Sequence, residues 1–199
     1  MPLAGNWDAY YVPTANPDPY PPSLDHYLNS QAVTSKIGSH TTWKLTSLDV
    51  YEKFAETGDW MRSSSPTLET VINAGVRTVI YDGDADYILN YKGVEAMVRA
   101  CPALSPPAIL AFRSNPIINL QVASLKTKFS SQFAKQKFET FTVNGKPAGL
   151  YKNAGAFSYL RVFGAGHEVP AYGWRGVPRG AAALQMFTQT MSGEQLYGT

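Results

Sequence analysis

The stretch GVRTVIYDGDAD, residues 75–86, decides the fold. Its first half is short, rich in β-branched residues and almost continuously apolar, which predicts a buried strand over 76–81. A helical pattern opens at Ser65-Pro66 and ends at the Asn73-Ala74-Gly75 turn directly before that strand. A helix, a glycine turn and a buried apolar strand are typical of an α/β unit with a parallel sheet.

Further elements are predicted on both sides of this unit. Residues 1–23 are rich in proline, which excludes regular helix and predicts an extended lead-in. Apolar residues at helical spacing predict helices over 24–37, 47–60, 92–100 and 181–191. The Asn144-Gly145 pair within 138–150 predicts a hairpin, and a second strand is predicted over 157–163.

Composition excludes several classes of partner. The chain has 199 residues, a net charge of +2 and 44% hydrophobic residues, which suits one domain or part of a larger one. The basic residues are scattered, so we expect no nucleic-acid partner. No apolar run is long enough for a signal peptide or a membrane span, so we expect neither. Cys101 stands alone and predicts no internal disulfide.

Two of the predicted strands end in glycine-bearing turns that carry ionisable side chains. The first turn contains Asp86, and the second, GAGHEVP over 164–170, contains His167. The carboxyl ends of strands are where catalytic groups gather in open α/β sheets, and an acid followed by a histidine fits the chain order Ser…Asp…His. A histidine can take and return the proton of a serine hydroxyl, while a carboxylate fixes its tautomer.

The neighbouring aspartates have a simpler interpretation. Asp82 and Asp84 read as turn residues, with Asp84 bracing the loop. Aspartates at alternate positions also resemble the start of a calcium loop, but Ile88 and Leu89 stand where that loop needs polar ligands or glycine. We therefore expect no metal and no cofactor.

Both blocks resemble one known family. AGVRTVIYDGDADYILNYKGVEAM, residues 74–97, and YLRVFGAGHEVP, residues 159–170, resemble the aspartate and histidine blocks of the serine carboxypeptidases, and the Glu after the histidine is similar to fungal members. The resemblance implies an α/β-hydrolase fold, hydrolysis of C-terminal peptide bonds, Asp86 as the triad acid and His167 as the base. It also implies a secreted or vacuolar protein whose substrate is a peptide C-terminus. Glu168, which follows the base, either lines the substrate pocket or is solvated.

The chain departs from that family in two places. It contains no Gly-x-Ser-x-Gly sequence, so the nucleophile is expected either from a separate serine-bearing N-terminal chain or from sequence outside these residues. Residues 99–124 have no counterpart in the family and form an atypical insertion, either a natural loop or translated non-coding sequence. We expect 1–199 to be a single partial α/β-hydrolase domain with an incomplete parallel sheet, which either aggregates in isolation or needs a partner.

Three functions therefore remain open. The first, which the two blocks favour, is the C-terminal part of a serine carboxypeptidase that is inactive alone. The second is a catalytically dead homologue used for binding. The third is a non-peptidase α/β-hydrolase that acts on esters.

Overall fold

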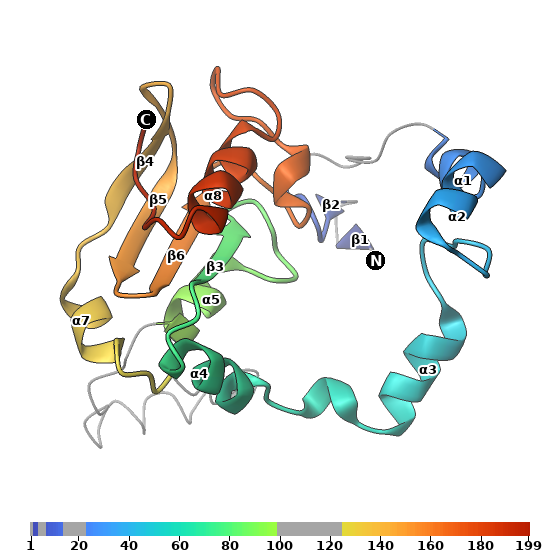
Figure 1. Cartoon of the computed structure of the whole chain (residues 1–199), viewed down its shortest axis with the longest axis horizontal. Coiled ribbons are helices and arrows are strands. Elements are labelled where there is room, and N and C mark those ends of the chain that lie inside the picture. Colours follow the sequence, from blue (N-terminus) through green and yellow to red (C-terminus); the bar gives the residue numbers. More distant parts are fainter. Residues whose placement is uncertain (1, 4–6, 14–22, 99–124) are drawn as a thin grey trace. The chain divides into compact units, whose positions relative to one another are not determined.

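The computed structural model describes residues 2–3, 7–13, 23–98 and 125–199 (Figure 1). They belong to two compact units, one of residues 1–17 and 65–199 and the other of residues 18–64. The predicted insertion at 99–124, with Cys101 inside it, lies outside the described residues. That the whole chain is one partial domain stays a prediction.

The larger unit is built on a four-stranded sheet with the order β3-β6-β5-β4. β3 and β6 are parallel, and the other two neighbouring pairs are antiparallel. The strands are β3 (Thr78–Gly83), β4 (Glu139–Val143), β5 (Lys146–Ala154) and β6 (Phe157–Val162). The predicted α/β architecture is confirmed, and the sheet is mixed because tight turns join β4 to β5 and β5 to β6, which only antiparallel strands permit.

The predicted hairpin turn is present at Asn144-Gly145. Both residues have positive φ angles, 49° and 74°, the backbone that a two-residue hairpin turn requires. A short antiparallel pair, β1 (Pro2–Leu3) and β2 (Trp7–Asp8), lies in the region predicted to be extended.

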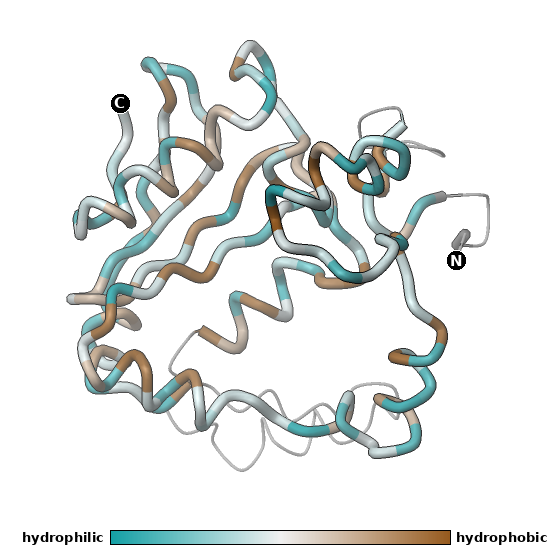
Figure 2. Tube along the Cα trace, turned by 45° about the vertical axis from the view of Figure 1, so that its right-hand side comes forward, coloured by the Kyte–Doolittle hydropathy of each residue, from teal (hydrophilic) through white to brown (hydrophobic). Residues whose placement is uncertain are grey.

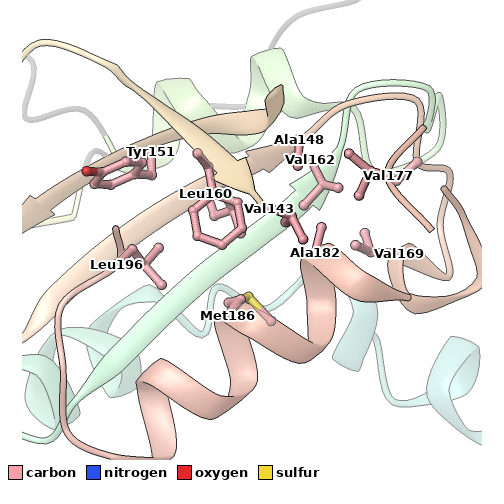
Figure 3. Close-up of a cluster of buried hydrophobic side chains, with 12 residues drawn as sticks. Val143, Ala148, Tyr151, Leu160, Val162, Val169, Val177, Ala182, Met186 and Leu196 are labelled. Atoms are coloured by element: carbon pink, nitrogen blue, oxygen red, sulfur yellow. The ribbon is translucent and has the colours of Figure 1, made fainter. Parts of the chain in front are cut away.

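Helices of the larger unit pack on both faces of the sheet. α8 (Ala181–Met191) covers one face, where Met186 meets Leu160 and Val143 in a buried apolar cluster (Figure 3). The opposite face is covered by α4 (Ser65–Asn73), α5 (Tyr91–Val98) and α7 (Ser130–Lys135), around a second cluster that includes Ile72 and Phe133. The hydrophobic runs of the strands lie between these layers (Figure 2). This burial on both faces explains the nearly continuous apolar sequence of β6.

The smaller unit consists of short helices. They are α1 (Leu24–Leu28), α2 (Gln31–Ile37), α3 (Leu48–Glu56) and the 3₁₀ turn η1 (Asp59–Met61). The predicted helix over 24–37 is broken at Asn29, whose side chain accepts from the Trp43 N–H at 2.7 Å instead of continuing the helix. The predicted helix over 47–60 ends early because Gly58 adopts a positive φ of 64°.

The helices of the described residues are short. In this part of the chain no helix has both the length and the apolar content that a bilayer crossing demands.

Candidate active site

The loops that follow β3 and β6 are joined by their backbones. The Asp84 N–H donates to Val162 O at 3.1 Å, and the Ala85 N–H donates to Ala165 O at 2.9 Å. The Asp84 carboxylate accepts from the Gly164 N–H at 2.7 Å, so Asp84 braces the loop as its sequence context predicts. Gly83 has no room for a side chain, because a Cβ there would overlap the Ala165 carbonyl. The two strand ends are thereby held in close contact.

This contact brings Asp86 and His167 together. The Asp86 Oδ2 atom lies 2.9 Å from His167 Nδ1. The Asp86 side chain is only 4% exposed, whereas the His167 side chain is 32% exposed. The second Asp86 oxygen accepts the Leu89 N–H at 3.2 Å, which fixes the carboxylate. The pair can therefore hold the Nδ1 proton in place and leave Nε2 as the nitrogen that exchanges a proton with a reactant.

A segment that sequence reasoning missed completes the surroundings of the pair. Residues 8–13 were predicted only to be part of an extended lead-in, but the His167 N–H donates to Tyr10 O at 2.9 Å. The Tyr10 ring also meets the imidazole edge-on, with ring centroids 5.1 Å apart. Most of these contacts use backbone carbonyls, which every residue has, so they produce no recognisable motif in the sequence. The aromatic pair Tyr10-Tyr11 is the one signal that distinguishes this segment in the sequence.

Glu168 is half-buried at the start of the 3₁₀ turn η2 (Val169–Ala171). Tyr172 follows this turn and stacks on Tyr11 with ring centroids 4.6 Å apart. Burial, with a smaller contribution from the negative charge of Glu168, raises the pKa of Tyr172 to about 12. Glu168 therefore lies close to the aromatic residues beside His167. Its contact with a substrate stays a prediction.

Asp82 differs from its interpretation as a turn residue. It lies within β3 and is buried, and its Oδ1 accepts the Tyr159 hydroxyl at 2.9 Å. Burial raises the pKa of Asp82 to about 7, and the charge of Glu95 adds to this shift. Glu95 itself pairs with Arg161 at 3.0 Å. The alternating aspartates therefore do not act together, and among the described residues no group of three or more metal-ligating side chains could hold an ion.

Comparison with known proteins matches the chain to one family. Residues 9–193 match the family model for serine carboxypeptidases. The chain is 32% identical over 198 residues to carboxypeptidase S1 of Penicillium janthinellum, covering 98% of this chain and 40% of that protein. It is 28% identical to carboxypeptidase Y of Komagataella phaffii, covering 74% of this chain and 24% of that protein. The carboxypeptidase Y of Schizosaccharomyces pombe is 31% identical over 74% of this chain and 12% of its own length. The chain thus spans less than half the length of these relatives.

Proposed function

Because the chain belongs to the serine carboxypeptidase family, with its α/β-hydrolase fold, we propose that it is the C-terminal part of an enzyme that hydrolyses C-terminal peptide bonds. The observation that supports this proposal most directly is the 2.9 Å contact between Asp86 Oδ2 and His167 Nδ1 at the ends of two neighbouring parallel strands. In line with the family resemblance, we propose a secreted or vacuolar location.

In the proposed reaction the pair serves a serine. His167 Nε2 takes the proton of the serine hydroxyl as the oxygen attacks the carbonyl carbon of the terminal peptide bond. Asp86 keeps the Nδ1 proton in place and stabilises the imidazolium that forms. The imidazolium then gives its proton to the leaving amine of the C-terminal residue, and water releases the acyl group by the same route.

The serine is proposed to come from a partner polypeptide. No Gly-x-Ser-x-Gly sequence occurs in the 199 residues, and 60% of carboxypeptidase S1 lies outside its 40% match to this chain. We propose that a serine-bearing N-terminal segment of this kind binds the chain and completes the sheet.

The outer edge of β3 offers a docking surface for that segment. Thr78 N and Asp84 N both donate toward β6, to Ala156 O and Val162 O. Because strand N–H groups alternate in direction, those of Val79 and Tyr81 point to the other side of β3. No strand among the described residues pairs there. This edge can therefore accept a further strand through backbone hydrogen bonds.

A chimera tests the proposal. The part of Penicillium carboxypeptidase S1 outside the match is fused to residues 1–199, and release of the C-terminal amino acid from a blocked dipeptide is measured. We expect hydrolysis by the chimera and none by the chain alone. His167→Ala should lower kcat/KM by about 10³-fold or more, because the general base is lost. His26→Ala, at an exposed histidine of the smaller unit, is the matched control.

Two outcomes would contradict the proposal. Hydrolysis by residues 1–199 alone would show that the nucleophile is inside the chain. A folded, monodisperse chimera that binds the dipeptide without cleaving it would favour the alternative function, a catalytically dead binding protein.

A further inference from the structure

We propose that Tyr10 is a positioning residue for His167, and that the segment Asp8–Pro13 sets the geometry between the histidine and its acid. The catalytic meaning of this inference rests on the proposed function. Its structural content, the orientation of the imidazole, does not depend on activity.

The backbone of this segment is hydrogen-bonded to both loops of the site. On the acid's side, the Tyr87 and Ile88 N–H groups donate to Ala9 O at 3.1 and 3.0 Å, and the Val12 N–H donates to Ala85 O at 3.0 Å. On the base's side, the His167 N–H donates to Tyr10 O at 2.9 Å. Consecutive carbonyls thus hold the residues that flank Asp86 and the backbone of His167. The distance between the two loops is fixed by a third segment as well as by the sheet.

The Tyr10 ring acts on the imidazole itself. The two rings meet at 67° with centroids 5.1 Å apart, the edge-to-face arrangement that aromatic pairs favour. The His167 side chain is 32% exposed, so the surrounding protein encloses the ring only in part and specific contacts must fix its orientation. Asp86 restrains one end of the ring through Nδ1. The Tyr10 ring restrains its plane.

Close packing keeps the segment in place against the histidine loop. A Cβ on Gly166, the residue before His167, would overlap the Tyr10 carbonyl and lie 2.9 Å from the Tyr172 hydroxyl. Tyr11 stacks on Tyr172 beside this point, at 4.6 Å. The glycine therefore permits the direct contact that the Tyr10 carbonyl and ring require.

The inference is tested by measuring the tautomer of His167 in variants of Tyr10. If Tyr10 had only a structural role, its substitution would leave this tautomer unchanged. The chain contains three histidines, so ¹⁵N-histidine labelling gives three imidazole signals, assigned with His26→Ala and His40→Ala. Magic-angle-spinning NMR of the sedimented chain reads the proton position whether or not the chain self-associates. We expect the Nδ1–H tautomer in the wild type and in Tyr10→Phe, which keeps the ring. In Tyr10→Ala the Nε2–H population should rise roughly tenfold, because the edge-to-face contact is lost.

Two control variants distinguish the effect of losing the Tyr10 ring from the effect of a general loss of structure. Tyr10→Leu keeps apolar bulk without a ring and should behave as Tyr10→Ala does. Tyr27→Ala, at an exposed tyrosine of the smaller unit, should leave the His167 signals unchanged. An unaltered His167 tautomer in both Tyr10→Ala and Tyr10→Leu would overturn the inference.

Kinetics of the chimera distinguish this inference from the proposed function. Tyr10→Ala should lower kcat with little change in KM, whereas Tyr10→Phe should have the kcat of the wild type. If the chimera is active but Tyr10→Ala changes neither its kcat nor the His167 tautomer, the inference is refuted and the proposed function is retained. An inactive chimera whose tautomer still responds to Tyr10→Ala would refute the proposed function alone.

Discussion

At the β4 edge of the sheet the segment Leu196–Thr199 covers the outer strand, whereas at the β3 edge no described residue pairs with the strand. Thr199 N donates to Thr142 O at 2.9 Å, and Asn144 N donates to the Thr199 hydroxyl at 3.1 Å. Leu196 is buried at 2% exposure, while Tyr81 on β3 is 43% exposed. One edge is thus closed by the chain's own residues, and the other keeps strand hydrogen-bonding groups available.

The two edges differ in their expected roles: the covered β4 edge contributes to stability, and the uncovered β3 edge is available for assembly. Unpaired edge strands are the usual place for another chain to add, and natural proteins normally cover or charge them. The β4 edge is covered, and it lies on the antiparallel side of the sheet, with β6 and β5 between it and β3. The β3 edge is uncovered, and β3 carries Asp86 just beyond its end. A partner that pairs with β3 would therefore arrive next to the acid and base.

The first prediction concerns the closed edge. Leu196→Ala should lower the free energy of unfolding by about 3 kcal/mol, because it empties a buried apolar site. Urea unfolding followed by tryptophan fluorescence at submicromolar concentration measures the change. Leu184→Ala, the same substitution at a residue 66% exposed on α8, should change little. Equal effects of the two substitutions would show that burial of Leu196 does not anchor the C-terminal segment that covers the β4 edge.

The second prediction concerns the open edge. Tyr81→Pro removes one outward N–H from β3 but keeps the pairing with β6, and proline is tolerated on an edge strand where its N–H faces outward. The serine-bearing segment is supplied as a separate polypeptide. The Kd of the Tyr81→Pro variant for this segment should rise about tenfold, because one hydrogen bond between the two strands is lost. Tyr81→Ala, which keeps the N–H, is the control and should bind more tightly than Tyr81→Pro. Identical dissociation constants would rule out strand addition at β3.

The third prediction concerns the pH dependence of stability that Asp82 confers on β3. The pKa of Asp82 is about 7 in the folded chain and ~3.9 in an unfolded one, so between these values the folded chain holds a proton that the unfolded chain has released. Stability should therefore fall as the pH rises from about 4 to about 7 and then level off. Asp82→Asn should remove this fall and be more stable than the wild type at pH 8, by up to about 4 kcal/mol, because each unit of pKa difference corresponds to ~1.4 kcal/mol. Urea midpoints at pH 4.5 and pH 8 test this, and parallel pH profiles for the two proteins would contradict it.

The sequence predicts the elements that carry local signals. The glycine turn before β3, the Asn144-Gly145 hairpin and the apolar run of β6 fix their own conformations, and the structure contains all three. Asp86 and His167 could be chosen because each follows a strand in a glycine-bearing turn, and they lie within hydrogen-bond distance. Their catalytic roles, and that of Glu168, stay predictions.

Long-range contacts account for what could not be predicted. The approach of residues 8–13 to the site uses the carbonyls of Ala9 and Tyr10, and any residue can supply a carbonyl. Asp82 looks like a turn residue because an aspartate before glycine favours turns. Its burial depends on Tyr159, which is distant in the sequence and adjacent in the sheet. The mixed sheet likewise follows from the tight turns that join β4, β5 and β6.

The backbone contacts between the β3 and β6 loops have a practical consequence. Ala85 N to Ala165 O and Asp84 N to Val162 O join the two loops without any residue from outside the chain. The acid and the base are thus preassembled within one polypeptide, and the nucleophile is proposed to come from another. Under the proposed function, two such halves, each expected to be inactive by itself, would make a split-enzyme reporter whose amino-acid release signals that the proteins fused to them have met.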